Sequence, residues 1–426
     1  MHSSSSEPER RLLDDADLRR YLIARLVSLS GSAVTYVVMP ALVYSLTGSA
    51  TWTALVAVSE GVPYLFAGLW AGLLADRFER KTVMISSDAA AALVLITIPL
   101  AAWADRLTAA HVLVVALLAQ TIFVFFDAAN LGALPSLVPR RRLPAANSLV
   151  AGGGTIVEAT VPAIAGLLLV VLSPSSLLVI DAVTFVASAL LVRSIVRPLS
   201  RPRVLSEQSG RRGTGGFAAI AQGVRFIVDH PVLRYMTVIG TFVAFSGGSL
   251  VGVLVVWADR SLGVREGDWR FGFVFAAWGV GAVAGSILMP RIIYRLGGVR
   301  TALVCLPLSG IGGVATALAT NWIVGVFAVA AWGAAYIIVA ANSVTLRQQV
   351  TPEPLMSRVM TVGRMTSFGS GFPAGAMVAG LLADHIDVSY ALLLCQGAIV
   401  AATAVAWWSP LRHAPRQLAT PEDAAA

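Results

Sequence analysis

The chain has 426 residues, of which 57% are hydrophobic and only 13% are charged. Soluble domains use about 25% charged residues to cover their surface, so this composition excludes a water-soluble protein and indicates a membrane protein. The formal net charge of +8 comes from 31 basic residues, which are all Arg except Lys81 and which lie between long apolar runs. This placement excludes a basic nucleic-acid-binding domain and is typical of cytoplasmic loops.

Residues 1–18 are rich in Ser and then in charge, and they lack the apolar core and cleavage site of a signal peptide. They are expected to form a short cytoplasmic tail before the first span. The two cysteines, Cys305 and Cys395, both lie in apolar runs, where a free thiol behaves as a small buried apolar residue. Cys and His residues show no metal-ligand spacing, so neither a metal site nor a cofactor is predicted.

Long apolar runs predict an all-α membrane protein with twelve transmembrane helices, since each crossing needs about 20 apolar residues. The charge-free runs 26–59 and 301–346 are too long for one helix, and each is expected to hold two spans joined by a tight turn, at 47–49 and at 321–322. The predicted spans are 19–46, 52–74, 83–104, 109–136, 144–172, 176–196, 232–258, 270–294, 299–319, 322–346, 355–383 and 388–409.

The basic residues also predict the orientation of these spans. With the N-terminus in the cytoplasm, the outer loops hold only Arg106, Arg260, Arg265 and Arg270. The other basic residues then lie in cytoplasmic segments or within the membrane, as the positive-inside rule requires. Both termini are therefore predicted to be cytoplasmic, in a bacterial inner membrane.

An internal repeat of half the chain length predicts two pseudo-symmetric halves of six helices. Pro139 and Pro352 lie 213 residues apart in similar segments, and Gly166-Leu-Leu recurs as Gly380-Leu-Leu. The predicted organisation is a tail (1–18), a six-helix bundle (19–196), a central cytoplasmic loop (197–231), a second six-helix bundle (232–409) and a tail (410–426).

Two further features concern single segments. Residues 217–228, in the central loop, have apolar residues at helical spacing and predict a surface helix. The pentapeptide Gly72-Leu-Leu-Ala-Asp76 recurs as Gly380-Leu-Leu-Ala-Asp384, but the two copies fall on opposite sides of the membrane. This second match is therefore interpreted as coincidence.

The loop between the second and third spans carries the most specific motif, Gly72-Leu-Leu-Ala-Asp-Arg-Phe-Glu-Arg-Lys81. Gly72 allows two helices to approach closely, and Asp76 is placed to accept hydrogen bonds from the N-terminus of the next helix. The basic residues of the motif are expected to pair with anionic lipid headgroups or with a carboxylate in the third span. These residues are Arg77, Arg80 and Lys81, and the carboxylate is Asp88.

This loop resembles the signature G-x-x-x-D-R-x-G-R-R/K of the major facilitator superfamily, with Glu79 in place of the second glycine. Segments at 46–49, 134–139 and 224–233 resemble the branch that contains the enterobactin exporter and the macrolide efflux pumps. The resemblance covers nearly the whole chain and implies export. It also implies that the matching loop residues latch the two halves in the outward-open state. The fifth-span antiporter motif survives only as Pro162 and Gly166, so the antiport expectation rests on the branch resemblance.

Six ionisable side chains are expected inside the membrane, where a charge costs several kcal/mol and marks a functional candidate. They are Arg25, Glu60, Asp127, Glu158, Asp181 and Arg364. Asp127 and Glu158 lie about 20 Å along their helices, which is deep enough to reach a central cavity and to bind a proton or the cargo. A structural ion pair is the alternative for both.

The other four charged residues also have alternatives. Glu60 precedes Gly61-Val-Pro63, which predicts a kink, so it is expected either at the cavity or beside a simple bend. Arg25 and Arg364 are cavity candidates whose side chains could instead reach the interface, and Asp181 could instead cap its helix. Six aromatic residues are candidates for a cargo pocket or for packing between helices: Phe123, Phe125, Phe126, Trp257, Trp278 and Trp332.

An ATP-driven pump needs a Walker A lysine after a glycine, whereas Lys81 follows Arg80. Neither a nucleophile–base pair nor a metal cluster points to an enzyme. The prediction is a monomeric secondary transporter, surrounded by lipids and without a nucleic-acid partner, that exports an amphipathic small molecule in exchange for protons. A proton-coupled importer of the same fold is the nearest alternative, and a membrane sensor that transports nothing is a more distant one.

Overall fold

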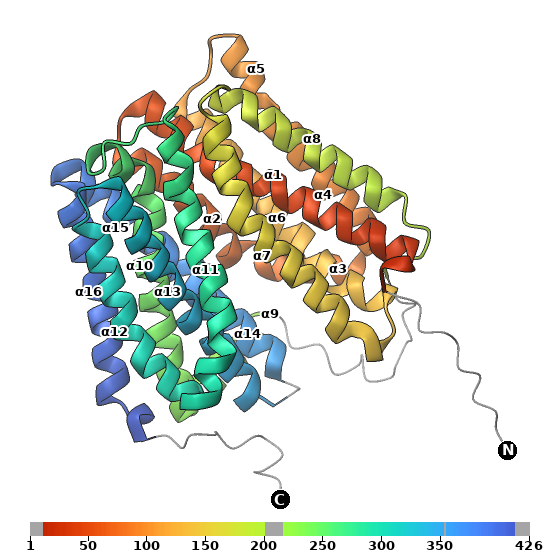
Figure 1. Cartoon of the computed structure of the whole chain (residues 1–426). Coiled ribbons are helices and arrows are strands. Elements are labelled where there is room, and N and C mark those ends of the chain that lie inside the picture. The colour runs from red at the N-terminus through yellow and green to blue at the C-terminus, as the bar shows by residue number, and fades with distance from the viewer. Residues whose placement is uncertain (1–11, 201–215, 353–354, 414–426) are drawn as a thin grey trace, which may run out of the picture.

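The computed structural model describes residues 12–200, 216–352 and 355–413, and these are almost entirely helical (Figure 1). The first group of helices is α1 (Ala16–Thr47), α2 (Ala50–Phe66), α3 (Gly68–Arg77), α4 (Arg80–Leu95), α5 (Thr97–Trp103), α6 (Ala109–Leu137), α7 (Leu143–Leu168) and α8 (Pro174–Arg193). The second group is α9 (Gly216–Asp229), α10 (Pro231–Arg260), α11 (Trp269–Leu296), α12 (Gly298–Ala317), α13 (Trp322–Val350), α14 (Met356–Arg364), α15 (Phe372–His385) and α16 (Val388–Trp408).

Ten helices in the described part of the chain are long and apolar enough to cross a membrane, with α4 and α5 counted as one. They correspond to ten of the twelve predicted spans. The other two predicted spans, 52–74 and 355–383, are helical but interrupted. Pro63 lies four residues before the break between α2 and α3, and a π-helix, Met365–Gly371, separates α14 from α15. A proline removes a backbone donor and a π-helix shifts the hydrogen-bond register, so each leaves shorter regular pieces.

The two predicted tight turns are confirmed. Gly48 adopts a left-handed conformation (φ 63°) and ends α1, and the Ser49 side chain caps the first turn of α2. The Asn321 side chain caps α13 by accepting the backbone N–H of Ile323 at 2.8 Å. The predicted surface helix of the central loop is confirmed as α9, which packs against α14 through Ile227.

Most helices before and after residues 201–215 pack mainly within their own group, which we call the N-bundle (α1–α8) and the C-bundle (α10–α16). Two helices of the N-bundle, α2 and α7, also pack closely against α15 and α11 of the C-bundle. We call the end of the molecule where α1 begins and α16 ends the terminal face, and the other end the distal face. Figure 1 shows the two bundles together near the distal face, at the top, and diverging toward the terminal face.

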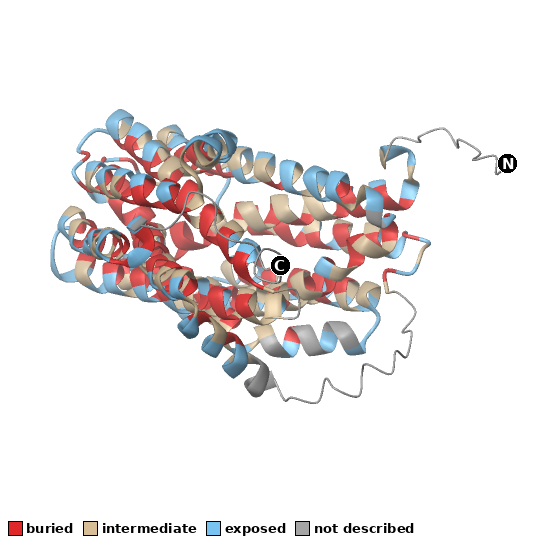
Figure 2. Ribbon diagram, turned by 90° about the horizontal axis from the view of Figure 1, so that it is seen from below, coloured by how far each residue is buried: buried red, intermediate tan, exposed pale blue. Residues whose placement is uncertain are grey.

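The buried cores follow the same arrangement. One apolar cluster, toward the distal face, contains residues of both bundles, including Val37, Leu254 and Trp257. Toward the terminal face the cores are separate, one built from α1, α4, α6, α7 and α8 and the other from α10, α12, α13 and α16. Figure 2, seen from below, shows buried residues inside the bundles and exposed residues on their outer surfaces. Many of the exposed residues are large and apolar, such as Leu190, Phe327 and Val400, as expected for helices that face lipid.

Candidate transport pathway

The distal face is closed by polar contacts between the bundles. Asp384, at the end of α15, accepts hydrogen bonds from the Ser49 hydroxyl at 2.6 Å and from the backbone N–H groups of Ala50 and Thr51 at 2.7 and 2.9 Å. The carboxylate therefore caps the N-terminus of a helix in the other bundle, where the helix dipole favours negative charge. Arg260 of α10 donates to the backbone carbonyl of Gly48 at 2.9 Å.

Closely packed glycines bring the bundle backbones together below these contacts. A Cβ atom on Gly166 of α7 would lie 2.2 Å from the Gly272 Cα of α11. A Cβ atom on Gly380 of α15 would lie 2.4 Å from the Ala54 Cβ of α2. Gly166 and Gly380 are the two glycines of the half-length repeat. Both therefore lie where one bundle meets the other.

Removing the cap on α2 is expected to loosen the distal face. Asp384→Asn keeps the shape of the side chain but removes its charge from the helix N-terminus, at a cost of about 1 kcal/mol. Spin labels at Leu46 and Ile386, exposed positions on opposite sides of the seal, should report a longer and broader distance distribution. Asp387→Asn is the matched control, because Asp387 caps α16 within its own bundle. An unchanged distribution in Asp384→Asn would show that the cap does not hold the seal.

Toward the terminal face, one ion cluster links the bundles. Asp127 of α6 lies 3.6 Å from an Arg25 nitrogen of α1 and 3.3 Å from an Arg364 nitrogen of α14. Arg364 also donates to the Tyr64 hydroxyl at 3.1 Å, and its guanidinium lies 4.4 Å from the centre of the Tyr64 ring. Three of the predicted site residues thus meet at one point. Arg364 directly precedes the π-helix, a feature often found at functional sites.

The Arg25 side chain is mostly buried within this cluster. Its side chain is 12% exposed, and its Nε and Nη1 atoms have no hydrogen-bond partner in the structure. The rings of Phe123 and Phe126 lie 5.9 and 5.6 Å from its guanidinium. The alternative in which Arg25 reaches the interface is therefore wrong, because Asp127 and these rings hold the side chain inside the bundle.

Two other candidate carboxylates line a cavity of about 190 Å³ inside the N-bundle. Glu60 of α2 borders it and has no hydrogen-bond partner among the described residues. Asp181 is fully buried in α8 and accepts hydrogen bonds from Thr35 and Thr184. Ser173 caps α8, so the alternative in which Asp181 caps its helix is wrong.

Glu158 differs from the other candidates. Its side chain is exposed, and no residue of the described chain forms an ion pair or hydrogen bond with it. Its backbone carbonyl faces Gly279 of α11, where a Cβ atom would lie 2.7 Å away, so α7 and α11 touch at this level. Tyr36 interacts electrostatically with both Glu158 and Glu60. The two unpaired carboxylates therefore lie near one tyrosine, close to the contact between the bundles.

The loop motif makes its contacts within the N-bundle. Arg80 donates to the Gly132 carbonyl at 2.8 Å, and Lys81 donates to the Ile195 carbonyl at 2.7 Å. Asp88 is buried, and neither of its carboxylate oxygens has a hydrogen-bond partner in the structure. The predicted pairing of Asp88 with these basic residues is therefore wrong, because backbone carbonyls near the ends of α6 and α8 take the cations instead. The surroundings of Gly72 and the side chain of Asp76 fall outside what the structure describes, and Arg77 is exposed.

A second cavity, of about 550 Å³, lies toward the terminal face of the C-bundle. Its lining comes from α10, α13, α14 and the π-helix, together with Leu131 of α6. It includes two arginines, Arg347 and Arg364, and no carboxylate. Ser343, Ser357, Thr361 and Ser367 add hydroxyl groups to this lining.

Most of the predicted aromatic candidates pack between helices. Trp257 and Trp332 are fully buried, and Trp278 packs edge-on against Trp332 at 5.8 Å between ring centres. Phe125 packs beside Tyr64 in a small apolar cluster. Phe123 is the exception, because it lines the N-bundle cavity.

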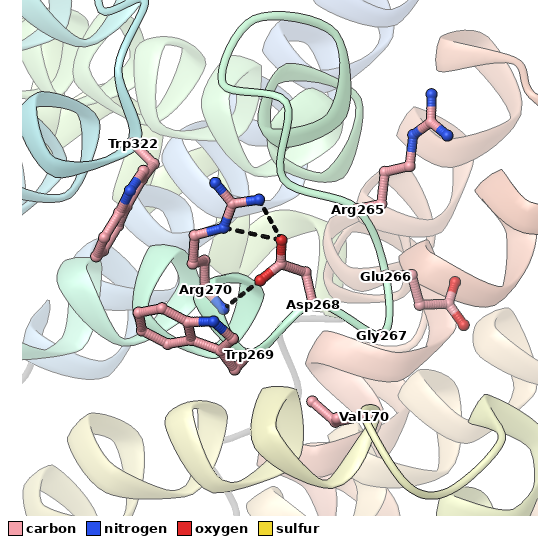
Figure 3. A pocket seen from close by; sticks show the side chains of 8 residues that line it. All are labelled: Val170, Arg265, Glu266, Gly267, Asp268, Trp269, Arg270 and Trp322. Atoms are coloured by element: carbon pink, nitrogen blue, oxygen red, sulfur yellow. Dashed lines mark hydrogen bonds and ion pairs between the residues drawn. The ribbon is translucent and has the colours of Figure 1, made fainter.

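A pocket of about 660 Å³ on the distal face contains none of the predicted site residues (Figure 3). In it, Asp268 accepts hydrogen bonds from the backbone N–H and the side chain of Arg270, which lower the pKa of Asp268. Burial raises the pKa of the neighbouring Glu266. Trp269 packs edge-on against Trp322 at 5.5 Å. This pocket is an open hollow at the N-terminal end of α11, away from the ion cluster.

Sequence reasoning missed several residues of the pathway. Arg347 lies one residue beyond the predicted end of its span at 346, whereas α13 continues to Val350. Asp384 is a second residue of the pathway that was not among the predicted site residues. No local signal marked Asp384, because its partners, such as the backbone N–H of Ala50, lie in the other bundle. The described residues include no group of His, Cys, Asp or Glu that could hold a metal ion.

Comparison with known proteins indicates that the chain is a transporter. The chain is similar to the multidrug efflux pump Tap of Mycolicibacterium fortuitum, with 27% identity over 376 residues, 85% of this chain and 88% of that protein. Tap of Mycobacterium tuberculosis is 30% identical over 298 residues, 68% of this chain and 69% of that protein. The enterobactin exporter EntS of Salmonella typhi is 23% identical over 384 residues, 90% and 89% of the two chains. These relatives are transporters rather than enzymes.

Solved transporter structures share the fold. A bacterial homologue of the lysosomal transporter Spinster, in an inward-facing and occupied conformation, has a TM-score of 0.71 at 13% identity and covers 93% of this chain and 97% of its own. The nucleoside transporter NupG has a TM-score of 0.70 at 13% identity, with 94% and 100% covered. The family model for transmembrane secretion effectors matches residues 13–424. The protein is therefore a multi-pass membrane transporter that belongs to the transmembrane secretion effector family of the major facilitator superfamily.

Proposed function

We propose that this protein exports an amphipathic small molecule from the bacterial cytoplasm in exchange for protons, by alternating access. Efflux pumps and an exporter among its relatives support the direction. The conclusion rests above all on the ion cluster in which Asp127 of the N-bundle holds Arg364 of the C-bundle. This bridge lies beside a cavity, while the opposite face is sealed by Asp384.

The proposed topology has twelve spans with both termini in the cytoplasm of a bacterial cell, in its inner membrane. The two interrupted segments, α2–α3 and α14–α15, complete the twelve. The arginine placement supports the orientation, since the loops assigned to the outside hold few basic residues. In this orientation the terminal face is cytoplasmic, and the structure corresponds to the state that an exporter loads with cargo.

The proposed cycle uses the unpaired carboxylates as proton carriers. Glu158 and Glu60 have no ion-pair partner in the described structure, so either can exchange a proton without breaking a salt bridge. After cargo binds from the cytoplasm, the bundles rock, the 72–81 loop closes the terminal face and the distal seal opens. Cargo leaves, a carboxylate takes up an external proton, and the return to the present state releases that proton inside.

Glu158→Gln should abolish proton-driven accumulation of cargo while exchange down a cargo gradient continues, because Gln cannot carry the proton. The assay uses proteoliposomes with an acidified lumen and two probes, ethidium and enterobactin. Transport into the acid lumen is expected for at least one probe in the wild type. Glu266→Gln, in the distal pocket, is the matched control and should behave like the wild type.

Two results would contradict the proposal. Cargo that moves only together with protons, from acid to alkaline, would identify an importer. Full proton-driven accumulation by Glu158→Gln would remove Glu158 from the coupling step, and the same measurement on Glu60→Gln would then decide whether Glu60 carries the proton.

A further inference from the structure

Arg347 is a buried cation that has no counter-ion among the described residues. Its residue is 4% exposed, and it makes no hydrogen bond or ion pair in the described structure. Its Nε atom is buried without a partner. A charge within a membrane-spanning helix is costly unless it has a partner or a polar cavity, so an unpartnered arginine marks a functional site.

The packing around Arg347 forms a slot that fits its guanidinium. A Cβ atom on Gly363 of α14 would lie 2.5 Å from the Arg347 Nη1, and one on Gly240 of α10 would lie 3.3 Å from the Nη2. Any larger side chain at Gly363 would push the guanidinium out of its place. Two glycines from two different helices therefore leave the room that the planar group occupies against the cavity wall.

The cavity beside this slot is suited to an anion. Of its charged lining residues, Arg347 and Arg364 are both cations, and the lining holds no carboxylate to neutralise them. Ser343 and Ser367 contribute hydroxyl groups that can donate hydrogen bonds. Arg364 is also bound to Asp127, whereas Arg347 keeps its full bonding capacity. Guanidinium groups bind carboxylates and phosphates through paired N–H donors.

We propose that Arg347 binds an acidic group of the cargo in the C-bundle cavity, so the exported molecules are amphipathic anions. This inference rests on the proposed export function and specifies its substrate class. The apolar remainder of the cargo would contact Val243, Val339 and Phe368, which line the same cavity. An anion bound here also places a negative charge near Arg364. It would then compete with Asp127 for the Arg364 guanidinium. Cargo binding would thereby loosen the bridge between the bundles.

A matched dye pair tests the substrate class. Carboxyfluorescein is an anion at neutral pH, and rhodamine methyl ester is a cation with the same xanthene ring. Equilibrium binding to the purified protein in phosphatidylcholine nanodiscs, followed by fluorescence polarisation, should favour carboxyfluorescein. Arg347→Gln should weaken carboxyfluorescein binding about tenfold or more, because a hydrogen-bonded charge pair is lost, and should leave rhodamine binding unchanged.

Controls separate a binding role from a structural one. Arg358→Gln removes another arginine of α14, one that contacts Gln222 of α9 and does not line the cavity, and should bind both dyes like the wild type. Arg347→Lys keeps the charge and should retain part of the carboxyfluorescein binding. Gly363→Ala keeps the arginine but fills its slot. It should weaken carboxyfluorescein binding and leave rhodamine binding unchanged.

Three outcomes would overturn the inference. The wild type could bind rhodamine more tightly than carboxyfluorescein, it could fail to bind carboxyfluorescein, or Arg347→Gln could weaken the binding of both dyes to the same extent. Displacement of the dye by phosphatidylglycerol in the nanodisc, dependent on Arg347, would assign the site to a lipid headgroup instead of cargo. Carboxyfluorescein that binds through Arg347 but is never transported under a pH gradient would leave the anion site standing and refute the export function.

Discussion

Asp127→Asn is expected to eliminate transport and to lower the free energy of unfolding by about 3 kcal/mol. The reason lies in Arg25, whose side chain is 12% exposed and whose ion-pair partner is Asp127, itself 15% exposed. Removing one member of a buried pair leaves the other charge uncompensated. Proteoliposome transport measures the first effect, and thermal unfolding of the purified protein measures the second.

The matched control is Asp229→Asn. Asp229 pairs with Arg225 on the surface of α9, where both side chains are largely exposed, so its loss should change stability by less than about 0.5 kcal/mol. A similar drop in both variants would mean that burial of the cluster is not what makes Asp127 important.

The double variant Arg25→Gln with Asp127→Asn separates stability from transport. It removes both charges of the buried pair, so most of the lost stability should return. Transport should stay absent, because Arg364 of the other bundle still lacks its partner. If transport returned with stability, the bridge between the bundles would have no role in the cycle. Asp127 would then be a packing charge of the N-bundle, which was the alternative weighed from the sequence.

The sequence predicted those parts of the fold that depend on local pattern. Apolar run length predicted the helices, Gly48 and Asn321 predicted the tight turns, and helical spacing predicted α9. The interruptions in the two remaining spans were harder to predict. Pro63 indicated a kink but not a break, and the π-helix has no proline at its start, so its register shift has no simple local signature.

Partners across the bundles could not be predicted, because they depend on how distant helices pack. The sequence identified Arg25, Asp127 and Arg364 as separate candidates, and only the structure brings them to one point. The prediction that Asp88 pairs with the basic residues of the loop was wrong. Asp88 is close to them in sequence, but Arg80 and Lys81 donate to backbone carbonyls instead. Asp384 is a residue that local pattern did not single out, because its partners, Ser49, Ala50 and Thr51, lie more than 300 residues away in the other bundle.

Gly166→Leu is expected to prevent closure of the distal face and so to abolish transport. A Cβ atom at this position already lies 2.2 Å from the Gly272 Cα, far inside the contact distance of two carbon atoms, and backbone cannot move aside as a side chain can. The leucine side chain must therefore separate α7 from α11. Because these helices belong to different bundles, the separation disfavours the present state and shifts the protein toward one open at the distal face.

Two pairs of spin labels measure this shift, after the free cysteines Cys305 and Cys395 are replaced by alanine. The distance between labels at Val171 and Ile323, exposed on the distal side of the two bundles, should increase. The distance between labels at Leu149 and Tyr294, toward the terminal face of α7 and α11, should decrease.

Gly152→Leu is the control, since it adds the same side chain to the same helix at a position where a Cβ atom meets nothing within 4 Å. It should leave both distances unchanged. If Gly166→Leu lengthened both distances together, the bundles would be separating rather than rocking, and alternating access about this contact would be the wrong description. A longer distal distance with a shorter terminal distance is the result that only a rocking motion produces. It would also explain why the repeat places a glycine at both bundle contacts, since each must close tightly in one state and part in the other.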